Sequence, residues 1–398
     1  NCSTEPTDPM TQRVYLDWNA TAPLRPEARD AVVATFEVCG NPSSVHGEGR
    51  RAHRILQDAR IVVAASLGAE PDTVVFTSGA TEANVLALTP GLHRTGTPPV
   101  ERLIVSAIEH SSVLSGGRFA KPRVEIAPVD RSGIVDLAQL DRLLADQPPA
   151  LVSIMLANNE TGAIQPIRDV AELVRARNGV LHVDAVPAFG KIDINFKGLQ
   201  ADLLSISAHK IGGPKGVGAL LVAEDLRGLE PALTGGGQEK GRRAGTENLP
   251  GIAGFGAAAK VAATNRERFA GHSDALRRRL EAGLKQIVAS TIIFSKDVPR
   301  LANTTLFTAP GLQAETAVIG FDLEGIAVSS GSACSSGKVQ PSHVLEAMQV
   351  DAALARGGIR ISFGWETTEN DIDRALEAWR KLAGTLVKKN DETVLERF

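Results

Sequence analysis

The alternation of short apolar runs with helical or glycine-rich segments predicts a parallel β-sheet covered by helices between residues 73 and 222. The last apolar run follows a glycine-rich turn and is predicted to return along the sheet. The predicted strands span residues 73–77, 103–107, 151–156, 180–183, 203–207 and 218–222.

Helical periodicity is found on both sides of this sheet region. Residues 26–36 and 48–67 are predicted helices, the second with apolar and small residues at helical spacing. After the sheet, residues 251–287 are predicted to form one long helix, and the last helix is predicted over residues 369–387.

A second group of strands predicts a smaller domain at the end of the chain. These strands would include residues 302–307 and 358–363. The predicted domain bounds are 14–270 for a large domain and 271–398 for a smaller C-terminal one, on which the N-terminal segment could pack. The fold class is therefore α/β, with two domains.

Composition indicates an ordinary soluble globular protein. The 398 residues are 43% hydrophobic and 22% charged, which is more apolar than disordered chains, and the length suits two domains. The net charge of -3 provides no basic field for nucleic acid. A nucleic-acid partner is therefore not expected.

The cysteines and the start of the chain predict a cytoplasmic protein that does not enter a membrane. Cys2, Cys39 and Cys334 are widely spaced and form no CxxC pair, and an odd number cannot all form disulfides. Residues 1–13 lack the basic start and apolar run of a signal peptide. No uncharged apolar stretch of about 20 residues follows.

The ends of the predicted strands carry the candidate chemistry, because ligands of open α/β sheets bind beyond the carboxyl ends of the strands. The first strand leads into TSGATEAN, where small residues would let backbone N–H groups at a helix start bind a phosphate. The Thr81 hydroxyl could add a donor. The alternative is a helix cap formed by Ser78 or Thr81 without any ligand.

The next strand ends place polar side chains at the same edge of the sheet. His110 could stack on a planar cofactor or exchange a proton, although a single histidine is more often structural. Asn158 and Asn159 follow the next strand, and Asp184 follows the one after. An aspartate there is often only a cap, but this one would be placed to pair with a ring nitrogen.

Lys210 follows the predicted strand 203–207 and precedes a glycine-rich turn. Its segment is too apolar for an ordinary solvated face, so desolvation would favour the neutral amine that Schiff-base chemistry needs. A phosphate cradle, a stacking histidine, an aspartate and a buried lysine are together what pyridoxal phosphate requires. The strand ends therefore predict this cofactor and no metal.

These residues also resemble a known family, the NifS/IscS-type cysteine desulfurases, which are class V aminotransferase-like enzymes of PLP fold type I. The resemblance covers nearly the whole chain, and its most specific feature pairs the AHK lysine segment with the SSGSACSSG cysteine segment. The motifs that carry it are VYLDWNATAP, NPSSVHGEGR, TSGATEAN, SAIEHSSV, ANNETG, HVDA, SAHKIGGPKG, GGGQEKGRRAGTEN, SSGSACSSG and IRISFG.

The resemblance implies a fold, an activity and partners. The fold would have a large domain with a mainly parallel seven-stranded sheet flanked by helices, and a smaller α/β C-terminal domain. The enzyme would convert L-cysteine to L-alanine with a persulfide on Cys334. It would supply the sulfur to a protein such as an iron–sulfur scaffold, and it would be a homodimer with shared active sites.

The resemblance also implies a role for each motif residue. Lys210 would form a Schiff base with the cofactor, Asp184 would bind the pyridine nitrogen, and His110 would stack on the ring and assist proton transfer. Asn158 would lie near the phenolic oxygen of the cofactor and the substrate carboxylate. The phosphate would be held by Ala80, Thr81, Ser207 and His209, and Thr246 would reach the phosphate of the neighbouring subunit.

Cys334 stands among serines and glycines between residues 329 and 337. This composition predicts a mobile segment, unlike the apolar surroundings that keep structural cysteines inert. A mobile thiol could visit the substrate sulfur and then carry the persulfide outward. The alternative is a small buried hydrophobic residue.

Arg360 lies in a predicted strand whose alternation separates it from Ile359, Ile361 and Phe363. An inward arginine needs a carboxylate partner, because an unpaired buried charge is costly. Either a protein acid supplies that carboxylate, or the substrate does through a two-pronged hydrogen bond. The resemblance favours the substrate.

One position departs from the family pattern. The family usually has HVDA-x-Q, with the glutamine donating a hydrogen bond to the phenolic oxygen of the cofactor, and Pro187 stands at that position. Proline has no such donor. The departure is interpreted as a change in the electronics of the cofactor.

Three other functions remain open at this point. A selenocysteine lyase would share the cofactor site and need not use Cys334. A class V aminotransferase would transfer the amino group to a keto acid and has no need for the cysteine. A non-catalytic scaffold for iron–sulfur assembly would need a broken cofactor site, and only Pro187 favours it.

Overall fold

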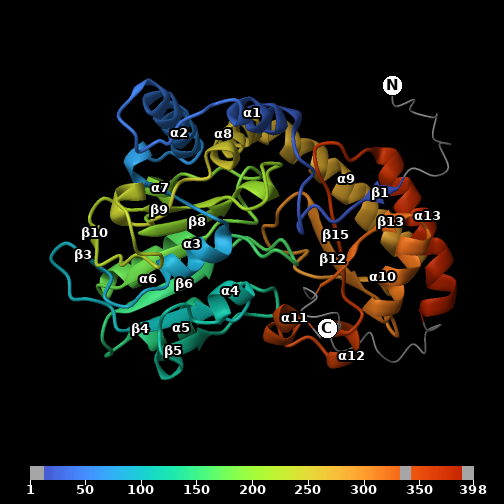
Figure 1. The fold of residues 1–398 in the computed structure, drawn as a ribbon. Coiled ribbons are helices and arrows are strands. Elements are labelled where there is room, and N and C mark those ends of the chain that lie inside the picture. The colour runs from blue at the N-terminus through green and yellow to red at the C-terminus, as the bar shows by residue number, and fades with distance from the viewer. Residues whose placement is uncertain (1–12, 332–341, 388–398) are drawn as a thin grey trace, which may run out of the picture. The chain divides into compact units, whose positions relative to one another are not determined.

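The computed structural model describes residues 13–331 and 342–387 (Figure 1). The chain divides into two compact units. The larger unit comprises Ala20–Asn159 and Ala163–Arg268, and the smaller unit comprises Asn1–Asn19, Glu160–Gly162 and Phe269–Phe398. Because compactness within one chain does not show that either part folds alone, the domain bounds 14–270 and 271–398 stay a prediction.

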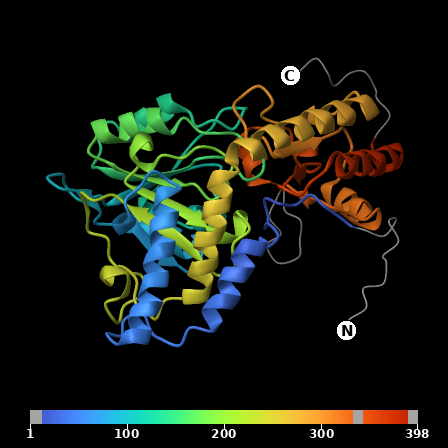
Figure 2. The same ribbon diagram turned by 90° about the horizontal axis from the view of Figure 1, so that it is seen from above.

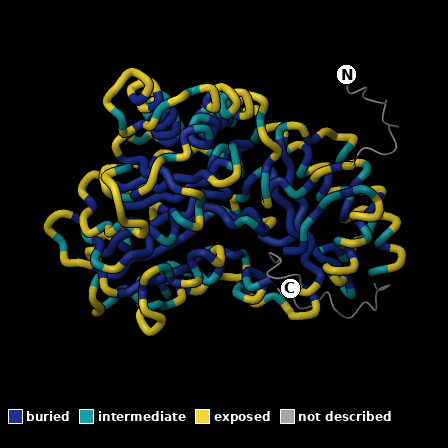
Figure 3. Tube along the Cα trace, in the orientation of Figure 1, coloured by how far each residue is buried: buried dark blue, intermediate teal, exposed yellow. Residues whose placement is uncertain are grey.

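A seven-stranded sheet forms the centre of the larger unit, as predicted. All neighbours are parallel except β9, which runs antiparallel to both β2 and β8. Most of the strands are buried along their whole length, which explains their continuous apolar runs (Figure 3). In spatial order they are β2 (Val74–Thr77), β9 (Gly218–Val222), β8 (Leu203–Ser207), β7 (Val180–Asp184), β6 (Ala150–Met155), β4 (Arg102–Ser106) and β5 (Val124–Ala127).

The edge strand β5 was not found from the apolar pattern. It is four residues long, and Glu125 and Ile126 are among its less buried positions. A short, partly exposed edge strand lacks the continuous apolar run that reveals the central strands.

Three helices, α1 (Pro26–Phe36), α2 (Gly47–Ala65) and α8 (Leu249–Thr264), pack side by side on the larger unit (Figure 2). Two glycines of α8 allow this close packing. A Cβ on Gly254 would lie 2.7 Å from Val32 Cγ2, and one on Gly256 would lie 2.9 Å from Ala59 Cα. The remaining helices of this unit are α3 (Ala80–Ala87), α4 (Ser111–Leu114), α5 (Leu137–Leu144), α6 (Ile167–Ala176) and α7 (Phe196–Leu199).

The single long helix predicted over residues 251–287 is wrong. The structure has two helices there, α8 and α9 (Arg266–Ile287), and the break is at Asn265. The Asn265 side chain donates to the Val261 carbonyl, and the Thr264 hydroxyl donates to the Lys260 carbonyl. Side chains that bond to the preceding turn compete with continuation of the helix.

The smaller unit is built on a four-stranded antiparallel sheet. Its core contains Trp379, whose ring centroid lies 5.3 Å from that of Phe307 and 6.3 Å from that of Phe321. In spatial order the strands are β11 (Ile292–Ile293), β12 (Thr304–Thr308), β15 (Ile359–Ser362) and β14 (Ser329–Ser330). The helices after α9 are α10 (Ala314–Leu323), α11 (His343–Ala347), α12 (Ala352–Ala355) and α13 (Glu369–Leu386).

Two local features close this unit. The N-terminal strand β1 (Val14–Tyr15) pairs in parallel with β13 (Ile326–Ala327). Thr368 and Asp371 form a capping box at the start of α13. Within the described ranges, every helix is too short or too polar to cross a membrane.

Candidate active site

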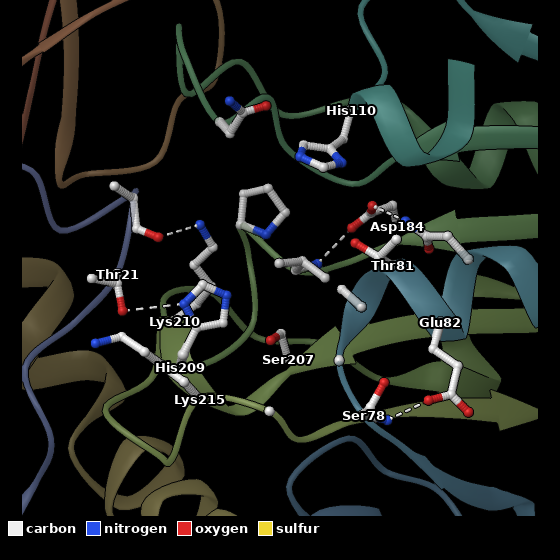
Figure 4. A pocket seen from close by; sticks show the side chains of 18 of the residues that line it. Thr21, Ser78, Thr81, Glu82, His110, Asp184, Ser207, His209, Lys210 and Lys215 are labelled. Atoms are coloured by element: carbon white, nitrogen blue, oxygen red, sulfur yellow. Dashed lines mark hydrogen bonds between the residues drawn. The ribbon is translucent and has the colours of Figure 1, made fainter. Parts of the chain in front are cut away.

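A cavity of about 580 Å³ opens in the larger unit, beyond the carboxyl ends of several parallel strands (Figure 4). Its walls come from segments that are far apart in the sequence. The residues that line it include Thr21, Ala80, Thr81, Glu82, Asn84, His110, Asn159, Asp184, Pro187, Ser207, His209 and Lys210.

The first wall is the start of α3, immediately after β2. Ala80 and Thr81 line the cavity, and Gly79 precedes them without a side-chain cap. Gly218 of β9 is required here, because a Cβ on it would lie 2.8 Å from Gly79 Cα. The helix start thus presents uncapped backbone N–H groups to the cavity, an arrangement that suits a phosphate.

An ion pair supports this helix start. Glu82 Oε2 accepts a hydrogen bond from the Ser78 backbone N–H at 2.7 Å, and Glu82 Oε1 accepts one from Arg243 Nε at 2.9 Å. Burial by itself would raise the pKa of Glu82, but the hydrogen bonds from Arg243 and Ser78 lower it. Arg243 therefore neutralises an acidic group that lies beside the anion cradle.

Asp184 lies at the end of β7 and is almost fully buried. Asn84 Nδ2 donates to Asp184 Oδ2, and the Val186 backbone N–H donates to Asp184 Oδ1, both at 2.9 Å. Burial raises the pKa of Asp184 above its ordinary value, and the bonds from Asn84 and Val186 and the charges of His110 and Lys210 offset this only in part. A positive group bound in the cavity would therefore be needed to favour the carboxylate fully.

His110 caps helix α4 with its own ring. The Ser112 backbone N–H donates to His110 Nδ1 at 3.2 Å, and the Ser112 hydroxyl lies 2.8 Å from the same nitrogen. Because Nδ1 accepts, the neutral ring carries its proton on Nε2. The same hydroxyl also accepts from Asn84, so His110 and Asp184 share one network.

Lys210 and His209 follow β8 at the opposite wall. Lys210 Nζ donates to the Ala20 carbonyl at 2.9 Å, and His209 Nδ1 lies 3.2 Å from the Thr21 hydroxyl (Figure 4). Burial, followed by the charges of Lys210 and Lys215, lowers the pKa of His209 to about 4. His209 is thus neutral near pH 7. Lys210 is only partly buried, because its side chain extends from the strand end toward the cavity.

The cavity brings together seven of the residues that the sequence predicts for the cofactor: Ala80, Thr81, His110, Asp184, Ser207, His209 and Lys210. Asn158 is not among the residues that line the cavity, and its role stays a prediction. Its amide donates to the Ile108 carbonyl at 3.1 Å, and its neighbour Asn159 lines the cavity instead.

Thr246 is not among the residues that line this cavity. Thr246 is exposed, so its role toward a neighbouring subunit stays a prediction. Cys334 lies outside the described residues. Arg360 belongs to the smaller unit, where its Nη2 donates to Asp17 Oδ1 at 2.6 Å. Of the two partners considered for Arg360, the structure contains the protein acid.

Comparison with known proteins identifies the family. Residues 14–375 match the family model described as Aminotransferase class-V. The chain belongs to this family. It is 42% identical over 372 residues to a cysteine desulfurase of Cereibacter sphaeroides, covering 92% of this chain and 94% of the relative. It is 38% identical to a cysteine desulfurase IscS of Dictyoglomus turgidum, covering 94% and 95%.

A solved structure agrees with this class-V assignment. The NifS-like protein from Rickettsia africae has a TM-score of 0.85 at 36% identity, covering 94% of this chain and 100% of that one. The predicted resemblance to NifS/IscS-type proteins and the predicted fold type are therefore confirmed. The class-V family and its cysteine desulfurases use pyridoxal phosphate in general.

The cavity of this class-V chain fits such a cofactor. Asn84 Oδ1 is buried and has no hydrogen-bond partner among the residues that the structure describes. An uncapped helix start suits the phosphate, Asp184 suits a protonated ring nitrogen, and Lys210 suits an aldehyde. The cavity thus offers groups that suit the phosphate, the ring nitrogen and the aldehyde carbon of pyridoxal phosphate.

Sequence reasoning missed several residues of the cavity. Asn84 and Glu82 lie inside the TSGATEAN motif, yet they were given no role. Helical spacing was the available signal, since Asn84 follows Ala80 by one turn on the same helix face. No local signal links Arg243 to Glu82, because 161 residues separate them.

Proposed function

We propose that this chain is a pyridoxal-phosphate-dependent cysteine desulfurase. It would convert L-cysteine and the Cys334 thiol to L-alanine and a persulfide on Cys334. The observation that carries the proposal is the convergence of Lys210, Asp184 and the α3 start on one cavity. The names of the relatives at about 40% identity support the choice of reaction.

The residues of the cavity would hold the cofactor by its two ends. Ala80, Thr81, Ser207 and His209 would bind the phosphate, and neutral His209 would do so as a hydrogen-bond donor. Asp184 would bind the ring nitrogen in its protonated form. When bound, the cofactor supplies a carbonyl carbon for the amino group and a ring that withdraws electrons from the substrate.

Two side chains would handle protons. Lys210 Nζ donates a hydrogen bond to the Ala20 carbonyl. In its unprotonated form this amine can take the α-proton of cysteine and return it. His110 carries its proton on Nε2, because Nδ1 accepts from Ser112. His110 can therefore donate a proton from Nε2 while its ring stays oriented.

The carboxylate of cysteine needs its own partners. We propose Arg360 for this role, together with Asn159 in place of Asn158, because Asn159 lines the cavity. A guanidinium carries five N–H donors in a fork, so one arginine can bind two carboxylates. A second carboxylate can therefore bind the same guanidinium.

Cys334 would take the sulfur. Its thiolate forms an S–S bond with the substrate sulfur while the C–S bond of cysteine breaks. The electron pair of the C–S bond stays with carbon, which takes up a proton and leaves as alanine. Atoms and electrons balance without an added oxidant or reductant.

The partners belong to the same proposal. A sulfur-acceptor protein such as an iron–sulfur scaffold would receive the persulfide sulfur. A second copy of the chain would contribute Thr246 to a shared site in a homodimer, in agreement with the exposure of Thr246 in one chain. The cytoplasm is the proposed location, because a persulfide carrier needs a free thiol.

The test measures alanine and sulfide from L-cysteine in the presence of a thiol. Wild type should produce both, and Lys210→Ala should abolish both. Cys334→Ala should still change the absorbance of the bound cofactor on addition of cysteine, but it should transfer no sulfur. A product that depends on a keto acid would favour an aminotransferase, and desulfuration that Cys334→Ala leaves unchanged would contradict the proposal.

A further inference from the structure

A buried carboxyl of the smaller unit lies between the two described residues that flank the stretch with Cys334. Glu160 is only 2% exposed. The Ser342 hydroxyl donates to Glu160 Oε2 at 2.5 Å. On the other flank, a Cβ on Gly331 would lie 3.0 Å from the same oxygen. One carboxyl oxygen therefore lies close to both flanks of residues 332–341.

Both flanks are also fixed to the framework of the smaller unit. The Gly331 backbone N–H donates to the Gly358 carbonyl at 2.9 Å, immediately after β14 pairs with β15. The Ser342 Oγ accepts from the Leu345 backbone N–H at 3.2 Å and thereby caps helix α11. Because Ser342 accepts from Leu345, its own proton is available for Glu160.

The absence of a side chain at Gly331 is part of this geometry. A Cβ there would also lie 3.3 Å from Leu306 Cδ1 and 3.7 Å from Ser342 Cβ. These distances leave little room between strand β14 and the carboxyl. Gly331 therefore lets Glu160 approach both flanks at once.

Burying a carboxyl is costly unless it is well bonded. Burial raises the pKa of Glu160 to about 7, although the bond from Ser342 and the charge of Arg360 lower it. An apolar residue would avoid this cost but could not accept a hydrogen bond from Ser342. The carboxyl therefore offsets part of its burial cost by accepting the hydrogen bond from Ser342.

We propose that Glu160 is a positioning residue that holds the two flanks of the Cys334 segment, so that sulfur transfer to Cys334 depends on its side chain. The inference rests on the proposed function, because it concerns the sulfur step. Glu160 itself takes no part in bond making. Its role is to keep the anchor points at Gly331 and Ser342 fixed.

Four variants separate this role from general stability. Glu160→Ala removes the acceptor, and Glu160→Gln keeps an oxygen that can accept from Ser342. Gly331→Ala pushes a methyl group against the carboxyl. Glu346→Ala is the matched control, because Glu346 is an exposed acid on the helix that Ser342 caps.

Three readouts are needed. Hydrogen exchange of peptides that contain the Gly331 and Leu345 amides reports on the anchors without any catalysis. Mass spectrometry of Cys334 after a single turnover reports persulfide formation. The absorbance change of the bound cofactor on addition of cysteine reports the steps before sulfur transfer.

Glu160→Ala should speed exchange at both anchors about tenfold, the effect of losing one hydrogen bond. It should slow persulfide formation by about tenfold or more and leave the first absorbance change within about twofold of wild type. Gly331→Ala should change the rates in the same direction. Below pH 7, where Glu160 keeps its proton, Glu160→Gln and Glu346→Ala should behave like wild type in all three measurements.

Either of two results in Glu160→Ala would overturn the inference and leave the proposed function standing: unchanged exchange and persulfide rates, or an equal loss of all cofactor responses. A Glu160→Gln variant as slow as Glu160→Ala would also overturn it, because the anchor needs an acceptor and not a charge. If wild type itself forms no persulfide, the proposed function fails and the inference fails with it.

Discussion

Asp184 of the larger unit and Glu160 of the smaller unit are both buried carboxyls, yet their neighbours differ. Asp184 accepts from Asn84 and from the Val186 backbone, and the charges of His110 and Lys210 also lower its pKa. Glu160 accepts a hydrogen bond from the Ser342 hydroxyl, and this bond and the charge of Arg360 lower its pKa. Burial opposes ionisation in both cases.

The difference separates two uses of the same chemical group. Asp184 lines a cavity, so its charge can meet a ligand. Glu160 touches the flanks of a chain segment, so its oxygen serves the geometry of the protein. The role of a buried acid is therefore assigned from the groups that surround its carboxyl, because burial alone does not decide it.

The largest effect is expected for Asp184→Asn. The variant loses the negative charge that would stabilise a protonated ring nitrogen, a loss of about 3–5 kcal/mol for a buried charge pair. Turnover of cysteine should therefore fall about 10²- to 10⁴-fold in steady-state kinetics at saturating cofactor.

The control for this prediction is Asp202→Asn in the same sheet. Asp202 is buried and pairs with Arg94 at 2.7 Å, but it does not line the cavity. The Asp202 variant should lose thermal stability while the turnover of its folded fraction stays unchanged. Equal turnover losses in the two variants would contradict the special role of Asp184.

The second effect concerns Glu160→Gln and pH. The raised pKa of about 7 means that the folded protein keeps a proton on Glu160 that the unfolded chain loses above about pH 4.5. Stability from this group is full below that value and is lost as the pH rises through 7. Gln does not titrate. The variant should gain up to about 3 kcal/mol relative to wild type between pH 5 and pH 8.

Denaturant unfolding at the two pH values measures this difference by the tryptophan fluorescence of the smaller unit, which contains Trp18, Trp365 and Trp379. Arg360 and Asp17 are kept as in wild type in every variant. The charge of Arg360 lowers the pKa of Glu160, and Asp17 forms an ion pair with Arg360. The exposed Glu346→Gln variant is the control, and its difference from wild type should be the same at both pH values. A Glu160→Gln effect that is also independent of pH would mean that Glu160 is ionised in the folded protein throughout.

The sequence predicted the strands that surround Asp184 in the larger unit, for a physical reason. Parallel strands bring their carboxyl ends to one edge, so His110, Asp184 and Lys210 could be placed together without any structure. The apolar runs of the central strands are continuous because both faces are covered. The strand ends and the residues that line the cavity were therefore predictable together.

The contacts around Glu160 in the smaller unit were not predictable in the same way. Glu160 and Ser342 are 182 residues apart, and Asp17 and Arg360 are 343 apart, so no local pattern joins them. The choice between Asn158 and Asn159 depends on which side chain of an irregular turn faces the cavity. Periodicity cannot decide this, because it fixes faces only inside helices and strands.

A smaller effect is expected for Asn84→Ala, which removes one donor from Asp184. Loss of a hydrogen bond to a buried charged group costs about 1.5–3 kcal/mol. Turnover should fall about 10- to 100-fold, less than in Asp184→Asn. Asn265→Ala is the control, because it removes an asparagine at the break between α8 and α9 that does not line the cavity. If Asn84→Ala turned over cysteine at the normal rate, the network under the cavity would have no part in catalysis.

The smallest effect is expected for Pro187→Gln, which changes the same cavity without touching Asp184. Pro187 lines the cavity and cannot donate a hydrogen bond. A glutamine there could donate to the phenolic oxygen of the cofactor and stabilise its negative charge. That oxygen would then stabilise the protonated Nζ of cofactor-bound Lys210 less strongly. The pKa of this nitrogen should therefore fall by about one unit. An absorbance titration of the bound cofactor measures the midpoint directly, and Pro187→Ala, which also lacks a donor, should titrate like wild type. A midpoint that is unchanged or higher in the glutamine variant would show that Pro187 does not tune the cofactor.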